Sequence, residues 1–315
     1  MKLKSLVTTG AALVALYCSG IAVAGGEGWS ADFEAAKKQA ADSKKDLLID
    51  FTGSDWCSWC IKLNKEVFSQ EPFKAGVKDK FVLVELDYPQ DKSKLSAATL
   101  KQNEELAKKY PISGYPTILL TDAEGKPFAA TGYEAGGPEA YVKHLDELRA
   151  KKAARDESLA AAAKLSGVEK AKALVAALAA MGLEDQMISN FYGDVAEQIK
   201  AADPKDETGF GKAAAVKVRL AAIQSELEEC SKKSDHEGAL AVMDKALKEG
   251  GFDTEETQKM MMVRAMIFGK LKKFDEAIKA MDEAKASAPD SERAAAIDGI
   301  KVRLEADKKA AETAK

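Results

Sequence analysis

Two cysteines in the first fifth of the chain have the spacing for sulfur or metal chemistry. Cys57 and Cys60 are separated by a serine and a tryptophan. A Cys-x-x-Cys pair serves thiol–disulfide exchange, zinc coordination, iron–sulfur clusters and haem attachment, so the spacing alone leaves these chemistries open. The pair follows an apolar run at 47–51, and the sequence Gly-Tyr-Pro-Thr stands further on at 114–117. The two motifs together indicate thiol–disulfide chemistry.

The residues around the pair argue against the other chemistries. Haem attachment needs a histidine directly after the second cysteine, and this chain has Ile61 there. A tetrahedral zinc site needs four ligands, and beyond the pair the sequence offers only Cys230, His144 and His236 as cysteines or histidines. The scarcity of histidines also disfavours a Cys–His hydrolase. We therefore predict no metal and no other cofactor, only a redox-active Cys57–Cys60 disulfide.

The start of the chain has the pattern of a secretory signal peptide. Lys2 and Lys4 precede an uncharged stretch with an apolar centre, and Ala-Val-Ala ends at Ala24. The pattern predicts a signal peptide over residues 1–24, cleaved after Ala24. The alternatives are an uncleaved membrane anchor and a lipoprotein modified at Cys18. We expect a periplasmic protein, with secretion or anchoring as alternatives, and an oxidising compartment in which disulfides persist.

Composition limits the class of protein further. Without Lys2 and Lys4 the chain has 45 basic and 51 acidic side chains, a formal charge of −6, and no basic block, which argues against a nucleic-acid partner. Three remaining cysteines cannot staple a chain of this length, so its stability must come from burial in about two domains. Near Ala150 the composition changes from aromatic and β-branched runs to Ala, Lys, Glu and Leu. We place one domain at 25–150 and an α-helical domain at 151–315.

The first domain has alternating signals for strands and helices. A helix should begin near Cys57, with Ile61, Val67 and Phe68 facing inward, and Gly125 suits the turn of a hairpin. The resulting order gives a mixed sheet covered by helices on both faces. Apolar runs predict strands at 47–51, 81–86, 117–121 and 127–131, and amphipathic periodicity predicts helices at 31–43, 98–109 and 138–149.

These residues resemble the thioredoxin superfamily. The sequence Phe-Thr-Gly-Ser-Asp-Trp-Cys-Ser-Trp-Cys at 51–60 is similar to the signature of exported thioredoxin-like proteins, and the likeness covers about residues 30–149. The resemblance implies an α/β thioredoxin-like domain and the activity of a protein-disulfide oxidoreductase.

The position of the pair at the start of a helix gives the two cysteines different roles. The unpaired N–H groups of a helix N-terminus stabilise a thiolate and lower the pKa of a cysteine from its free value of about 8.5. Cys57 is therefore the expected nucleophile that attacks client disulfides. Cys60 lies one helical turn further on and is expected to resolve the mixed disulfide.

The resemblance also implies a surface that binds clients. Trp56 is similar to a tryptophan that shields the pair in the family, with a plain core aromatic as the alternative. Trp59 is expected to be exposed and to offer apolar contact area. Pro116 is similar to the family's cis-proline, which lets the backbone of Tyr115 pair with a client strand. Asp55 is expected to cap the helix.

Asp50 matches a buried acid that family members use to move protons to and from the resolving cysteine. A buried carboxylate has a raised pKa and can act as a general base near neutral pH. Thioredoxin itself has one residue fewer between this acid and its first cysteine, so a structural Asp50 at the end of the strand is the alternative interpretation.

The second half of the chain contains a helical repeat. Residues 236–246 resemble residues 275–284, and Met243 and Met281 are 38 residues apart. Tetratricopeptide repeats have about 34 residues in two packed helices, and a four-residue insertion reconciles the count. The likeness covers about residues 216–304. Such repeats form surfaces that hold peptides or proteins, so we expect a protein partner there, with a helical cap that binds no partner as the alternative.

The predicted function is that of an exported thiol–disulfide oxidoreductase. Its partners would be client proteins with disulfides and a thiol partner that exchanges electrons with it, expected at the membrane. The residues between the cysteines carry no positive charge, which favours a reductase or isomerase over a strong oxidant. The alternative is a scaffold whose helical repeats hold a partner while Cys57–Cys60 is a static disulfide.

Overall fold

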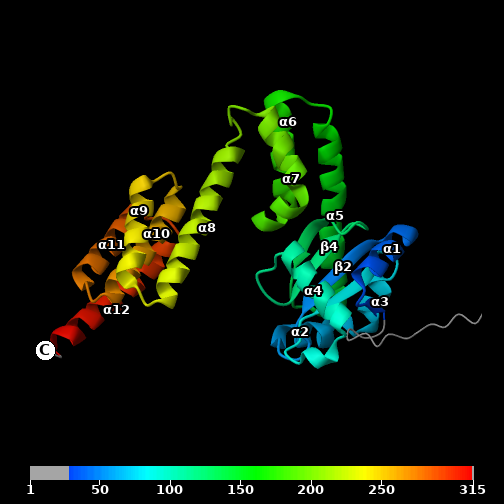
Figure 1. The fold of residues 1–315 in the computed structure, drawn as a ribbon, viewed down its shortest axis with the longest axis horizontal. Coiled ribbons are helices and arrows are strands. Elements are labelled where there is room, and N and C mark those ends of the chain that lie inside the picture. The colour runs from blue at the N-terminus through cyan, green and yellow to red at the C-terminus, as the bar shows by residue number, and fades with distance from the viewer. Residues whose placement is uncertain (1–27, 314–315) are drawn as a thin grey trace, which may run out of the picture. The chain divides into compact units, whose positions relative to one another are not determined.

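The computed structural model describes residues 28–313 (Figure 1). The predicted signal peptide, with its cleavage after Ala24 and the lipoprotein alternative at Cys18, lies outside the described residues. Contacts within the chain divide it into two compact units between Asp203 and Pro204. In the part that the structure describes, no helix is both long enough and apolar enough to cross a membrane.

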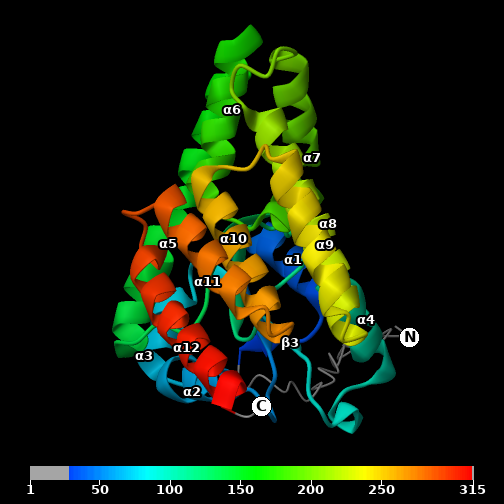
Figure 2. The same cartoon turned by 90° about the vertical axis from the view of Figure 1, so that its left-hand side faces the viewer.

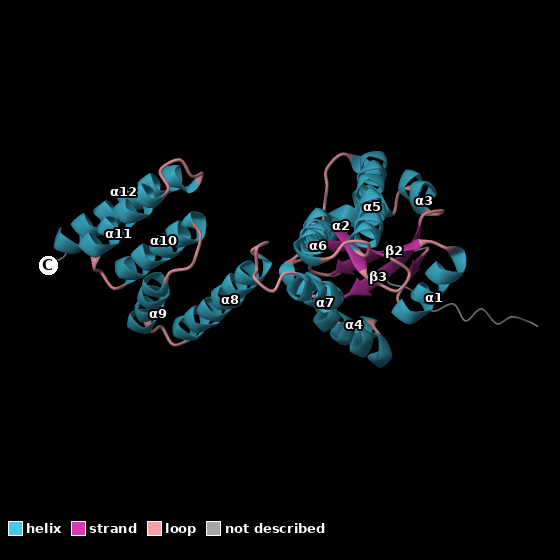
Figure 3. Cartoon of the chain, turned by 90° about the horizontal axis from the view of Figure 1, so that it is seen from above, coloured by secondary structure: helices cyan, strands magenta, loops and turns pink. Residues whose placement is uncertain are grey.

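A five-stranded mixed sheet forms the centre of the first unit (Figure 3). The strand order is β1-β3-β2-β4-β5, in which β2 runs parallel to β3 and antiparallel to β4. Gly125, with φ +83°, lies in the β4–β5 turn as predicted. The strands are β1 (Trp29–Ser30), β2 (Asp46–Thr52), β3 (Phe81–Asp87), β4 (Thr117–Thr121) and β5 (Pro127–Thr131).

Helices cover both faces of this sheet, which confirms the predicted α/β architecture. Figure 3 shows α1, α4 and α7 on one side and α2, α3 and α5 on the other. The helical elements of this unit are α1 (Phe33–Ser43), α2 (Ser58–Leu63), a π-helical turn η1 (Asn64–Phe68), α3 (Glu71–Val77), a 3₁₀ turn η2 (Lys92–Lys94), α4 (Ala97–Lys109), α5 (Gly137–Ala162), α6 (Gly167–Met181) and α7 (Asp185–Ala202).

The two faces of β2 have different chemistry because side chains alternate along a strand. Leu47, Ile49 and Phe51 belong to a hydrophobic cluster with residues of α1, α4 and α7. Leu48 and Asp50 therefore point to the opposite face, where α2, η1, α3 and α5 lie. A carboxylate thus occupies the buried layer beneath the helix that carries the cysteines.

Two short elements were not predicted, and one residue predicted to face inward is exposed. Strand β1 and helix α3 were not predicted, since β1 has two residues and α3 contains Pro72 and Gly76, which indicate chain breaks. Ile61 is 49% exposed rather than inward-facing. The buried stripe of this helical segment runs through Cys60, Leu63 and Val67, and Ile61 lies off that stripe.

The expected domain boundary near Ala150 falls inside α5, and the compact unit continues to Asp203. One connection across the expected boundary is a buried polar network that ties α5 and α7 to the hairpin. Arg155 donates hydrogen bonds to Tyr192 Oη at 3.1 Å and to Asp122 at 3.2 Å, and Tyr192 Oη donates to the carbonyl of Pro127 at 2.6 Å. The compact unit thus includes helices that follow the composition change near Ala150.

The second unit is entirely helical in its described residues. Each helix packs against the next in sequence, and Figure 2 shows α10, α11 and α12 side by side. Met243 and Met281, the two matching methionines of the repeat, are both buried. The helices are α8 (Phe210–Lys232), α9 (His236–Glu249), α10 (Thr254–Lys270), α11 (Phe274–Ser287) and α12 (Arg293–Thr313). The predicted helical C-terminal region is confirmed.

Candidate active site

The two cysteines lie where β2 leads into α2, joined by a disulfide with an S–S distance of 2.05 Å. Cys57 occupies the N-cap position of α2, and its Sγ accepts a hydrogen bond from the backbone N–H of Cys60 at 3.1 Å. The helical segment continues from Ser58 through η1 to Phe68. The sulfur of Cys57 thus lies at the N–H end of a helix, where a negative charge is stabilised.

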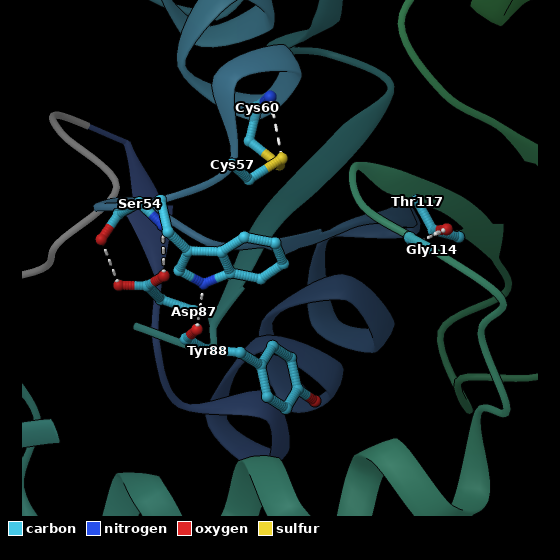
Figure 4. The surroundings of a disulfide bond; sticks show 8 residues. Ser54, Cys57, Cys60, Asp87, Tyr88, Gly114 and Thr117 are labelled. Carbon is cyan, nitrogen blue, oxygen red and sulfur yellow. Dashed lines mark hydrogen bonds between the residues drawn. A yellow bond between two sulfur atoms is a disulfide. The ribbon is translucent and has the colours of Figure 1, made fainter. Parts of the chain in front are cut away.

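The loop before Cys57 is fastened to the end of β3 (Figure 4). Ser54 donates two hydrogen bonds to the carboxylate of Asp87, from its backbone N–H at 2.9 Å and from its hydroxyl at 2.7 Å. The Nε1–H of Trp56 donates to the backbone carbonyl of Tyr88 at 2.8 Å. These contacts fix the backbone that presents the cysteine pair.

Asp55 completes this attachment, and its predicted role as the cap of the helix is wrong. Its carboxylate accepts hydrogen bonds from the backbone N–H groups of Gln90 at 2.9 Å and Asp91 at 3.1 Å, and from Lys94 Nζ at 3.1 Å. The two backbone hydrogen bonds are the main reason that the pKa of Asp55 falls to about 2. Cys57 itself occupies the cap position that the sequence pattern had suggested for Asp55.

Two exposed tryptophans each directly precede a cysteine of the pair. Trp56 and Trp59 are 43% and 53% exposed, so Trp56 is not a plain core aromatic and Trp59 is exposed as expected. The Trp56 ring meets the Tyr115 ring edge-on, with 5.4 Å between centroids. The Trp59 ring lies 5.1 Å from the Tyr133 ring, and Lys62 Nζ lies within 5.0 Å of both ring centroids.

The loop between α4 and β4 reaches the cysteine motif through the contact of Tyr115 with Trp56. The peptide bond between Tyr115 and Pro116 is cis, as the family resemblance implied. Thr117 closes the loop, since its hydroxyl donates a hydrogen bond to the carbonyl of Gly114 at 2.8 Å (Figure 4). Segments almost sixty residues apart in sequence therefore meet at the disulfide.

Asp50 is buried, and its Oδ1 has no hydrogen-bond partner within the described part of the chain. Burial raises its pKa well above the ordinary value, and the nearby charges of Glu85 and Asp87 raise it further. Glu85, its register partner on β3, is also buried, and burial followed by the charge of Asp87 raises the pKa of Glu85 to about 7.

The remaining cysteine and the two histidines belong to other parts of the described chain. His144 on α5 shares a hydrogen bond of 2.9 Å with the hydroxyl of Thr131. Cys230 and His236 belong to the second compact unit, and Cys230 is half-buried with a free thiol. Among residues 28–313, no three His, Cys, Asp or Glu side chains lie where they can hold a metal ion.

Comparison with known proteins assigns the first unit to a family. Residues 33–149 match the sequence model of the thioredoxin-like domain. Over 117 residues the chain is 39% identical to the disulfide bond reductase DsbH of Chlamydia pneumoniae, a match that spans 37% of this chain and 69% of that protein. The chain belongs to the thioredoxin-like family. With its Cys57–Cys60 pair it is a protein-disulfide oxidoreductase.

One further protein and one solved structure are similar to this thioredoxin-like domain. The thioredoxin-related protein DsbJ of Chlamydia pneumoniae is 32% identical over 96 residues, which is 30% of this chain and 27% of DsbJ. A solved structure of the DsbH oxidoreductase is 34% identical, covers 38% of this chain and 81% of its own, and superposes with a TM-score of 0.36.

The thioredoxin-like domain also contains site residues that sequence reasoning missed. Glu85 interrupts the apolar run 81–86, and an acidic residue within a buried strand is a signal that was available. Asp87 and Tyr88 follow the same strand directly. Tyr133 has no local signal, because only the fold brings it to Trp59.

Gly53 supplies a test of how Trp56 is positioned. A Cβ atom at residue 53 would lie 2.5 Å from two atoms of the Trp56 indole, so Gly53→Ala must displace the ring from the Tyr88 carbonyl. We expect kcat/KM for a protein disulfide to fall about tenfold or more, since small displacements of positioning groups are costly. Gly193→Ala is the control, because its Cβ meets nothing within 4 Å. Equal activities of the two variants, measured by client reduction, would contradict this role.

Proposed function

We propose that this protein is an exported disulfide reductase in which Cys57 attacks client disulfides and Cys60 resolves the mixed disulfide. The observation that carries the proposal is the position of Cys57 Sγ at the helix N-terminus, within 3.1 Å of the Cys60 N–H. This hydrogen bond and the helix dipole favour the thiolate, which is the form of cysteine that attacks a disulfide. Cys60 contributes its backbone N–H to this hydrogen bond. Its own sulfur lies one helical turn after Cys57.

The reaction proceeds in two exchange steps. The Cys57 thiolate attacks one sulfur of the client disulfide, so that a mixed disulfide forms and the first client sulfur leaves as a thiolate and takes a proton from water. Cys60 then loses its proton and attacks Cys57 Sγ, which releases the second client thiolate, also protonated from water. The client gains two electrons, Cys57–Cys60 becomes oxidised, and a partner dithiol returns the pair to the reduced state.

Asp50 is the proposed acceptor of the Cys60 proton. Its carboxyl lies in the buried layer beneath α2, and burial raises its pKa well above the ordinary value, which makes the carboxylate a stronger base. The same carboxyl can return the proton when a donor reduces the disulfide. This role explains why an aspartate without a hydrogen-bond partner for Oδ1 occupies a buried strand.

Client binding is proposed at the aromatic surface around the disulfide. Trp56 and Trp59 offer exposed apolar area beside the cysteines, and aromatic side chains contribute large contact area at protein interfaces. The backbone of Tyr115, before the cis Pro116, is proposed to hydrogen-bond an extended client segment. This arrangement suits unfolded or flexible protein clients.

The direction of electron flow and the cellular context are proposals drawn from several features. The relative DsbH carries the name of a disulfide bond reductase, and no positive charge stands between the cysteines, which favours the reductase direction. The signal-like sequence ending at Ala24 supports export to the periplasm. In the periplasm, the electron donor is proposed to be a membrane-bound thiol partner. The helices of residues 216–304 are proposed to form a tetratricopeptide-like surface that binds a further protein.

Reduction of insulin tests the proposed activity. We expect the protein, with dithiothreitol as electron donor, to accelerate the precipitation of insulin B chains well beyond the rate with dithiothreitol alone. No acceleration would contradict the proposed function. It would favour the static-disulfide scaffold, which the low exposure of Cys57 and Cys60, 6% and 4%, also fits.

A further inference from the structure

Glu85 is a buried acidic side chain, and glutamate is rarely buried unless a partner compensates its charge. It lies within β3 and is only 7% exposed, and the parallel register pairs it with Asp50 on β2. Residues paired in register on neighbouring strands lie side by side, about 4.8 Å apart along the hydrogen-bonding direction, with their side chains on the same face. Two carboxyl groups therefore share one buried layer beneath α2.

No positive charge compensates this pair. In the described part of the chain neither Asp50 nor Glu85 forms an ion pair, and no cation contributes to the electrostatic environment of either group. The titratable groups that act on them are Asp87 on β3, which is held by Ser54, and Tyr141 on α5. The Cys57–Cys60 disulfide does not titrate, and neither a carboxyl nor a phenol can supply a positive charge.

Two neighbouring buried carboxylates without a cation cannot both carry a charge near neutral pH at low cost. Like charges at close range disfavour the second ionisation, and the pair then loses its protons in two separate steps. The unpartnered Oδ1 of Asp50 is the one buried side-chain oxygen or nitrogen without a hydrogen bond in residues 28–313. It is available to receive a proton.

We propose that Glu85 is a positioning residue that makes Asp50 and Glu85 a pair holding one proton and one negative charge near neutral pH. This inference rests on the proposed function, since the pair deepens the role of Asp50 there. Asp50 accepts the proton of Cys60 during resolution of the mixed disulfide when it is the ionised member of the pair. In the reverse step, when a dithiol reduces Cys57–Cys60, protonated Asp50 returns a proton to the Cys60 sulfur.

The test is the titration of the Asp50 carboxyl carbon by ¹³C NMR in the full oxidised chain. In Glu85→Gln the neighbouring charge is removed while shape is kept, and we expect the pKa of Asp50 to fall by about one unit or more. Glu71→Gln is the matched control, because Glu71 is exposed on α3, and it should leave Asp50 unchanged. An unchanged pKa of Asp50 in Glu85→Gln would overturn the proposal.

A second measurement keeps the proposal open to refutation if Glu85→Gln does not fold. In the unaltered protein, the carboxyl carbons of Asp50 and Glu85 should each show two inflections at the same two pH values, as coupled sites do. Single, independent inflections would overturn the pair. Both titrations are independent of insulin reduction, so a failed reductase assay with a coupled titration would contradict the proposed function and leave the pair standing.

Discussion

Replacing Cys57 by serine should reduce the rate of insulin reduction by a factor of at least about 10³. A serine hydroxyl at this position cannot form the anion that attacks a disulfide at neutral pH, whereas the Cys57 sulfur accepts the N–H of Cys60 at the start of α2. The measurement is turnover with dithiothreitol as donor.

Two further cysteine variants complete this experiment. Cys60→Ser should leave the first attack intact and accumulate a mixed disulfide between Cys57 and the client, visible as a mass increase that a reductant removes. Cys230→Ser is the control and should retain full activity. If Cys57→Ser accumulates the mixed disulfide and Cys60→Ser does not, the roles of the two cysteines are reversed.

Replacing Asp50 by asparagine should stabilise the protein at alkaline pH and slow its reaction. Burial raises the pKa of Asp50 above that of the unfolded chain, so the unfolded state loses this proton first as pH rises. Stability of the unaltered protein therefore falls between the unfolded pKa, about 3.9, and the folded pKa. An asparagine side chain does not ionise in this pH range, so Asp50→Asn should not show this loss of stability. At pH 8 we expect Asp50→Asn to be more stable by about 1–3 kcal/mol.

The pH dependence of this difference separates the charge of Asp50 from a packing effect. At about pH 3 and below, under the unfolded pKa of about 3.9, Asp50 is largely protonated in both states, and the advantage of Asp50→Asn should disappear, as measured by urea unfolding. Turnover should fall by about 10²-fold, the usual contribution of a general acid or base. Asp42→Asn serves as control, because Asp42 is exposed on α1. A gain in stability that is the same at about pH 3 as at pH 8 would contradict the buried charge.

Local sequence patterns were sufficient to predict the sheet and the position of the cysteines. The apolar runs that form β2, β3, β4 and β5 each stand between turn residues. The order of these strand signals and the helix signals between them was enough to predict a mixed sheet. The start of a helix near Cys57 followed from the same pattern. These features depend on neighbours in sequence, which a single chain displays directly.

Features that depend on distant contacts could not be predicted in this way. Asp55 looks like a helix cap because it stands just before a helix, yet the backbone N–H groups of Gln90 and Asp91 bind it. The end of the first domain was placed near Ala150 because composition changes there, whereas contacts of α7 with distant residues, among them that of Tyr192 with Arg155, extend the compact unit to Asp203. The pairing of Asp50 with Glu85 needed the strand register.

The central claim is that Cys57–Cys60 is an exchanging redox pair and not a static clip. Equilibration of the protein with glutathione or dithiothreitol buffers, followed by alkylation of free thiols and mass spectrometry, measures its reduction potential. We expect a midpoint between about −270 and −180 mV, in the range of thioredoxin-like exchange proteins. A midpoint below about −300 mV, where structural disulfides lie, would contradict the claim and favour the scaffold.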